Sequence, residues 1–260
     1  MTSPSGTVVW DGTGTLRVRY DDPASDSLRT RLGERILPVE ALQAVEVNAS
    51  ELQLVLREGA DPLQSVTGGH VDSLYHFPIN DPAVAGQIAR DIRRTLARRD
   101  VPTAPAARWL VAPPAAPDRI EGRDATLSVA NGQLTFAYKR GAGRKKKALG
   151  NPWSVALDEI VDVEWAAGQG WSRGFLRMSV ARAPLERPKP KHDPAALVTD
   201  RGSDVDALFF GARLLPRPHL EVLPQTELLG EKVVVNAAPK AEEKEPELQP
   251  AEKAVGPRVA

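Results

Sequence analysis

The chain has 260 residues, with 34 basic and 34 acidic side chains and no cysteine. The balanced charge gives no general electrostatic case for nucleic-acid binding, and the lack of cysteine excludes disulfides, thiolate catalysis and cysteine-ligated metals. The first residues lack a signal-peptide pattern, and no apolar run approaches the ~18–20 residues of a membrane-spanning helix. We therefore expect a cytoplasmic protein with no transmembrane segment.

The first hundred residues predict a series of antiparallel strands that ends in one helix. Asp81-Pro82 combines an N-cap residue with proline at the first helical position. A helix of about 16–18 residues is expected after it, with its apolar stripe on the core. The residues of this stripe, spaced by four, are Val84, Ile88, Ile92 and Leu96. Alternating apolar residues predict strands before it at 8–10, 16–20, 36–47, 52–56 and 74–79.

A proline-rich linker, 101–119, follows the helix, and its Trp109-Leu-Val111 segment is apolar enough to dock on a domain. Residues 184–194 form a proline- and lysine-rich insertion, and a closing helix at 204–215 ends at Pro216. The tail, 217–260, is expected to be extended to disordered. The strands predicted in the second half are 126–129, 134–138, 153–165, 175–180 and 196–199.

Short stretches of the first half recur in the second half. Gly14 recurs as Gly132 and Val45 as Val163, so the offset is 118 residues at both places. A recurring apolar alternation indicates a small folding unit that is used twice. We predict two tandem domains, at 5–100 and 120–216, and each is expected to be a small β-barrel closed by a C-terminal helix.

A strand meander closed by a helix is the pleckstrin-homology-like pattern. The segments 32–42, 52–63 and 174–180 resemble the tandem actinobacterial family known as domain of unknown function 4429, over about residues 5–216. The resemblance implies a mainly β (α+β) double pleckstrin-homology-like fold, with no assigned activity and no catalytic residues to transfer. Family members that end in a short helical oligomerisation motif differ from this chain, whose tail shows none.

An acyl hydrolase is the alternative from another functional class. The segment 170–174 fits the Gly-x-Ser-x-Gly nucleophile elbow around Ser172, and Asp193 and His219 follow in the order of acid and base. An elbow needs a helix after its serine, whereas residues 175–180 alternate as a strand. We therefore interpret this segment as a hairpin turn and expect no enzyme.

The remaining motifs give no metal or cofactor site. The histidines at 70, 76, 192 and 219 are scattered, without the spacing of metal ligands. His76 alternates with two aromatic residues and is expected to be a half-buried strand residue. Gly12-Thr-Gly14 and Gly141-Ala-Gly143 lack the rest of a phosphate-binding loop, so we expect turns there.

The strongest local signal is a basic loop at 139–147, which carries six positive charges and no acid. Its candidate anion-binding residues are Lys139, Arg140, Arg144, Lys145, Lys146 and Lys147. Residues 144–147 are expected to project into solvent without carboxylate partners, whereas the matching loop at 21–31 holds three acids. Near an anionic membrane each basic residue contributes ~1 kcal/mol, screened by salt. The alternatives are a solvated loop and, less favoured, nucleic-acid phosphates.

These observations predict a non-enzymatic binding or scaffolding protein without cofactors. Its partner is expected to be an unknown protein or, through the basic loop, an anionic membrane surface in weak contact. Duplication of a small strand-rich unit without converging polar residues favours interaction surfaces over catalysis.

Overall fold

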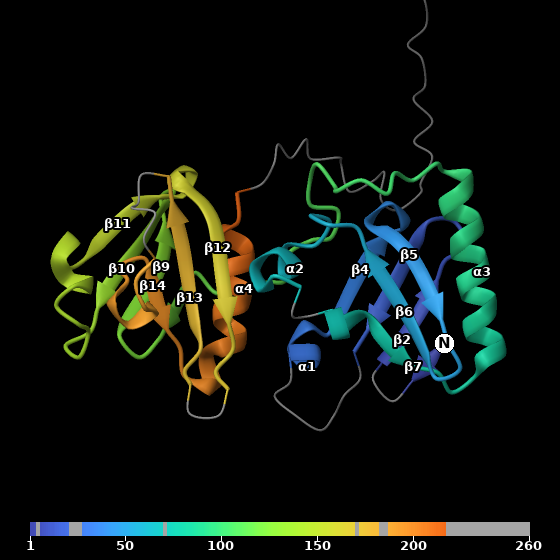
Figure 1. The fold of residues 1–260 in the computed structure, drawn as a ribbon, viewed down its shortest axis with the longest axis horizontal. Coiled ribbons are helices and arrows are strands. Elements are labelled where there is room, and N and C mark those ends of the chain that lie inside the picture. The colour runs from blue at the N-terminus through green and yellow to red at the C-terminus, as the bar shows by residue number, and fades with distance from the viewer. Residues whose placement is uncertain (4–5, 21–27, 70–71, 170–171, 182–186, 217–260) are drawn as a thin grey trace, which may run out of the picture. The chain divides into compact units, whose positions relative to one another are not determined.

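The computed structural model describes residues 1–3, 6–20, 28–69, 72–169, 172–181 and 187–216 (Figure 1). The predicted tail at 217–260 lies outside the described residues, as do residues 21–27 of the acidic loop. Among the described helices, none has both the length and the apolar character that crossing a membrane requires.

The strands of the first half form two antiparallel sheets. One sheet pairs four strands in chain order: β1 (Thr2–Ser3), β2 (Gly6–Trp10), β3 (Thr15–Arg19) and β4 (Glu34–Pro38). The other pairs three: β5 (Leu42–Val47), β6 (Glu51–Leu56) and β7 (His76–Pro78). A 3-10 turn at Val39–Ala41 separates the sheets, so the single strand predicted at 36–47 is wrong.

The second half repeats this plan. Its four-stranded sheet contains β8 (Arg119–Glu121), β9 (Ala125–Ala130), β10 (Gln133–Tyr138) and β11 (Trp153–Ala156). Its three-stranded sheet contains β12 (Ile160–Ala166), β13 (Phe175–Val180) and β14 (Ala196–Val198). A 3-10 turn at Leu157–Glu159 and a register shift at Ile160/Asp162 match Val39–Ala41 and Leu42/Ala44, again 118 residues apart. The sequence repeat is therefore a structural repeat.

The fold is mainly β, but the expected closed barrels are absent from the described residues. Each half holds two separate sheets, of four and three strands, and β4 does not pair with β5. The 3-10 turn and the register shift that follows it redirect the chain from one sheet to the next. Inward-facing residues of both sheets, such as Leu16, Leu37 and Leu52, are fully buried in the core.

A C-terminal helix closes each half: α3 (Pro82–Arg98) and α4 (Asp204–Leu214). The Asp81 carboxylate accepts hydrogen bonds from the Ala83 and Val84 amides at 2.9 and 3.1 Å, which confirms the predicted N-cap. The stripe was misplaced at its start, because Val84 is 40% exposed. The buried face of α3, which packs against β5, consists of Ala85, Ala89, Ile92 and Thr95. The small alanines let the helix approach the strand closely.

The two halves are joined by a helix that the sequence patterns did not predict. The short helix α1 (Leu28–Leu32) precedes β4, and α2 (Pro62–Thr67) lies in the connection from β6 to β7. α2 packs against α4 and β12 of the second half (Figure 1). The linker docks as expected, because the amides of Leu110 and Val111 donate to the Ala60 carbonyl at 2.9 and 3.0 Å.

The turn between β2 and β3 gives a pH-dependent prediction. The Asp11 carboxylate accepts hydrogen bonds from the amides of Thr13, Gly14 and Thr15 at 2.7, 2.8 and 3.0 Å. Partial burial acts to raise the pKa of Asp11, but these backbone hydrogen bonds outweigh it and lower the pKa from 3.8 to about 2. The ionised carboxylate therefore stabilises the fold above pH ~4, and this contribution is lost as the pH falls towards 2.

We expect Asp11→Asn to remove that pH dependence while keeping an acceptor in the turn. Because Asp11 is largely exposed, the difference between the two proteins should stay below about 1 kcal/mol. Urea unfolding at a series of pH values between 5 and 2 measures it. Parallel loss of stability in both proteins would show that other carboxyl groups dominate this range.

Candidate functional site

The basic loop is anchored to the second half by a buried lysine. Lys146 begins a 3-10 turn at Lys146–Leu149, and its side chain is fully buried. Its ammonium group forms an ion pair with the Asp124 carboxylate and donates to the Ala196 carbonyl at 2.7 Å. Asp124 also accepts from the Val198 amide at 3.0 Å. One ion pair thus ties the loop to β14 and to the turn before β9.

The expectation that residues 144–147 all project into solvent without carboxylate partners is therefore wrong at Lys146. Two further lysines are engaged: Lys139 lies 3.5 Å from the Glu121 carboxylate, and Lys147 donates to the Arg140 carbonyl at 3.1 Å. The surface pair of Lys139 is weak because both side chains remain solvated.

Three cations of the loop remain exposed: Arg140, Arg144 and Lys145. None of their side chains has a hydrogen bond or ion pair within the part of the chain that the structure describes. Leu149, at the end of the same 3-10 turn, is an exposed large apolar side chain, 55% accessible. The loop therefore presents unpaired positive charge beside an apolar side chain, on a turn that Lys146 holds in place.

The buried groups below the loop form a polar network. Burial lowers the pKa of Lys146, while burial and the nearby carboxylates of Asp124 and Asp193 raise the pKa of Tyr138. The Tyr138 hydroxyl donates to the Pro194 carbonyl at 2.9 Å. These side chains bond to one another or to the backbone, so they position the loop rather than bind a ligand.

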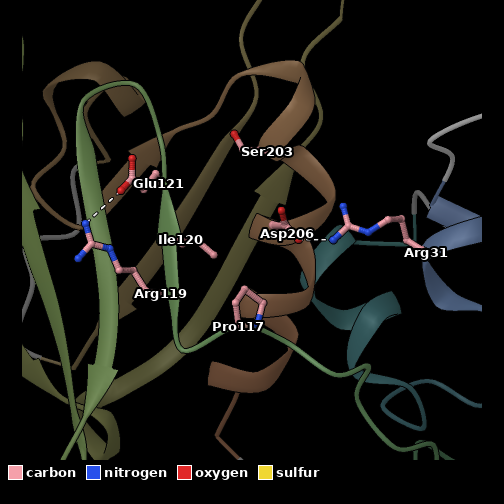
Figure 2. Close-up of a pocket in the computed structure, with 7 residues that line it drawn as sticks. All are labelled: Arg31, Pro117, Arg119, Ile120, Glu121, Ser203 and Asp206. Atoms are coloured by element: carbon pink, nitrogen blue, oxygen red, sulfur yellow. Dashed lines mark hydrogen bonds and ion pairs between the residues drawn. The ribbon is translucent and has the colours of Figure 1, made fainter.

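A shallow hollow of about 470 Å³ lies where the halves meet (Figure 2). Arg31 reaches from α1 to form an ion pair with Asp206 of α4, as Figure 2 shows. Arg119 pairs with Glu121 at 3.0 Å on β8. This hydrogen bond lowers the pKa of Glu121, and so does the nearby positive charge of Lys139. Because the charged side chains of the hollow are already paired, we interpret it as part of the junction.

A second groove, of about 360 Å³, lies between β5 and the C-terminal part of α3. Ala44 and Val45 line it from the strand, and Leu96 and Ala97 line it from the helix. The sequence patterns placed no site there, because its residues come from three segments that are separately typical of an ordinary strand, helix and linker.

Ser172 lacks the geometry of a nucleophile elbow. The strand β13 begins three residues after it, where an elbow requires a helix, and its own amide donates to the Gln169 carbonyl in a turn. Asp193, the acid in the hydrolase hypothesis, pairs with Arg177 at 2.9 Å. His219 lies outside the described residues.

No group of side chains suited to hold a metal ion occurs within the described ranges. His76 is half-buried on β7, as predicted, and its Nδ1 lies 3.3 Å from the Glu51 carboxylate. His70 lies outside the described residues.

Comparison with known families identifies the repeat. A family model described as Domain of unknown function (DUF4429) matches residues 8–76 and 129–215. The chain belongs to this family. The two matched segments fall one in each half, in agreement with a tandem arrangement.

The match to DUF4429 covers the basic loop and α2, whereas α3 lies between the two matched segments. Among curated proteins no match was found. The family description names no activity, so a function for this DUF4429 chain has to be argued from its surfaces.

Proposed function

We propose that the protein is a non-enzymatic interaction protein with two pleckstrin-homology-like halves, which binds an anionic membrane surface through its second half. The arrangement of each half supports the first part, because a four-stranded sheet, a three-stranded sheet and a closing helix follow in that order. The second part depends on the basic loop.

One observation carries the membrane proposal. Arg140, Arg144 and Lys145 are exposed and unpaired among the described residues, and the exposed Leu149 lies at the end of the 3-10 turn that follows them. A membrane interface suits this combination, since cations approach lipid headgroups while an apolar side chain enters the boundary of the acyl chains. The anionic lipids of the cytoplasmic leaflet make the cytoplasm the expected location.

The buried anchor makes the loop a better surface than a mobile basic segment. Lys146 fixes the turn through Asp124 and the Ala196 carbonyl, so less conformational entropy is lost when the loop meets a partner. In this proposal Lys146 has a positioning role, and it makes no contact with lipid.

The test is sedimentation of the full chain with phosphatidylcholine vesicles that contain or lack phosphatidylserine. Changing Arg140, Arg144 and Lys145 together to alanine should weaken binding to the anionic vesicles about a hundredfold at low salt. This follows from ~1 kcal/mol for each basic residue, with 1.4 kcal/mol for each factor of ten. The difference should shrink at physiological salt because of screening.

A control variant loses the same charge elsewhere: Arg17, Arg108 and Arg173 are changed to alanine. It should bind like the wild type if the loop, rather than net charge, makes the contact. Equal loss in both variants, or no binding to anionic vesicles, would contradict the proposal. Binding to duplex DNA with a steep salt dependence, and not to vesicles, would instead assign the loop to nucleic-acid phosphates.

A further inference from the structure

A helix from the first half packs along a seam of the second half, which is the line where α4 meets β12. α2 packs against α4 and against β12, an edge strand of its sheet (Figure 1). Its buried Val66 reaches the place where α4 crosses β12: a Cβ added at Gly211 would lie 3.2 Å from Val163 Cγ1 and 3.5 Å from Val66 Cγ1. The second half is therefore completed by a short helix that it does not itself supply.

The equivalent seam of the first half lies between β5 and α3. Val45 of β5 corresponds to Val163 of β12, because the two strands match at the repeat offset. The groove of about 360 Å³ follows this seam, with Ala44 and Val45 on one side and Leu96 and Ala97 on the other. Asp100, Val101 and Thr103, which follow α3, also line the groove, and no described helix packs there as α2 packs on the second half.

The helix α3, which forms one wall of this groove, carries four arginines against one aspartate. Arg93 lies across the seam and donates to the Val45 carbonyl at 2.8 and 3.1 Å. Arg90 and Arg98 bond to neutral side chains of their own helix, while the aspartate pairs with a neighbouring arginine at 3.4 Å. The acid among the lining residues is Asp100. Three guanidinium groups thus have no carboxylate partner among the described residues.

We propose that this groove binds a short helical segment of a partner protein, with an apolar residue at its centre and acidic residues beside it. The internal precedent of α2 supports a helix with a single apolar anchor, and the arginines of α3 that lack a carboxylate partner favour acidic flanks. This surface lies in the other half from the basic loop and does not depend on the membrane proposal.

The probe is a fluorescent peptide that copies residues 59–69, with glutamate in place of Gln64 and Ser65. It keeps the Asp61-Pro62 helix start and the Val66 anchor, and it adds the acidic charge. A second peptide has lysine at the two glutamate positions. A third keeps the glutamates and carries proline in place of Thr67, which breaks the helix. Binding to the full chain is measured by fluorescence anisotropy.

Ala97→Glu introduces bulk and negative charge into the groove at an exposed helix position. The acidic peptide should bind this variant at least about tenfold more weakly than the wild type. Ala83→Glu, the same change at an exposed position near the start of α3, should leave binding unchanged. The lysine and proline peptides should each bind the wild type at least about tenfold more weakly than the acidic peptide.

A second variant keeps the proposal testable if the Ala97→Glu protein misfolds. Changing Arg90 and Arg98 to glutamine removes positive charge from α3 without adding bulk, and it should weaken binding of the acidic peptide more than binding of the lysine peptide. Circular dichroism confirms that each variant is folded.

Four results would overturn the proposal. The first is that the acidic peptide fails to bind the wild type, and the second is that it binds the Ala97→Glu variant equally well. The third is that the proline peptide binds as tightly as the acidic peptide, which would indicate that the peptide adds to β5 as an extended strand. The fourth is that the full chain self-associates in sedimentation equilibrium and that Ala97→Glu abolishes this association, which would identify a second copy of the chain as the occupant of the groove.

Discussion

Changing Lys146 to methionine is expected to lower the free energy of unfolding by about 3–5 kcal/mol. Methionine fills a similar volume, but it leaves the Asp124 carboxylate in a mostly buried site without its cation. The Ala196 carbonyl also loses its donor from the lysine. Guanidinium unfolding followed by circular dichroism measures the change.

A double variant separates loss of the ion pair from poor packing. Combining Lys146→Met with Asp124→Asn removes both charges, and the asparagine amide oxygen can still accept from the Val198 amide. We expect this variant to regain most of the stability, to within about 1–2 kcal/mol of the wild type. A single variant that loses less than about 1 kcal/mol, or a double variant no better than the single, would show that the pair does not anchor the loop.

The burial of Lys146 could not be predicted from the sequence. Within the basic loop it is one cation among six, and a charge run is usually solvated. Its partner Asp124 lies 22 residues earlier, in a turn that comes next to the loop only when β9 pairs with β10. A local pattern carries no information on such a pair.

The repeat was predictable because it depends on apolar alternation, which the sequence displays directly. The bend between the two sheets leaves a weaker signal, in the spacing of the apolar residues. In the first half the apolar residues change from a spacing of two at Leu37 and Val39 to a spacing of three at Val39, Leu42 and Val45. A period of three is that of a 3-10 turn, and the structure places the turn at Val39–Ala41.

The missed helix α2 had the same start signal as the predicted helix α3. Asp61-Pro62 repeats the pattern of Asp81-Pro82, and both aspartates accept a backbone hydrogen bond at the N-cap. With only six residues, α2 is too short to show helical periodicity, and Gly59 just before it is typical of a turn that ends a strand. A capping signal was therefore the one local clue to the element that joins the halves.

Changing Asp61 to alanine is expected to cost about 3–5 kcal/mol of unfolding free energy. Asp61 is fully buried and accepts from the Arg35 guanidinium at 2.8 Å, from the Tyr75 hydroxyl and from the Leu63 amide. Its loss leaves the buried Arg35 without a counter-ion and removes the N-cap of α2. Chemical unfolding measures the cost.

Asp61→Ala should also destabilise part of the second half. α2 covers the seam between α4 and β12, so a loosened α2 exposes that seam to water. We expect hydrogen exchange of the backbone amides to speed up in α4 and β12 as well as in α2, although the hydrogen-bond partners of the Asp61 side chain, which are Arg35, Leu63 and Tyr75, all lie in the first half.

Asp81→Ala provides the matched control, because it removes the same residue type from the same capping position of α3. Asp81 is exposed, so only the cap is lost, at a cost of about 1 kcal/mol, and exchange in α4 should not change. If the two substitutions cost the same, the Arg35 ion pair contributes nothing beyond the cap. If exchange rises only in the first half, α2 does not hold the seam of the second half closed. Faster exchange in α4 and β12 would show that α2 stabilises the packing of the second half. It would thereby support the groove between β5 and α3 as a binding site for a similar helix.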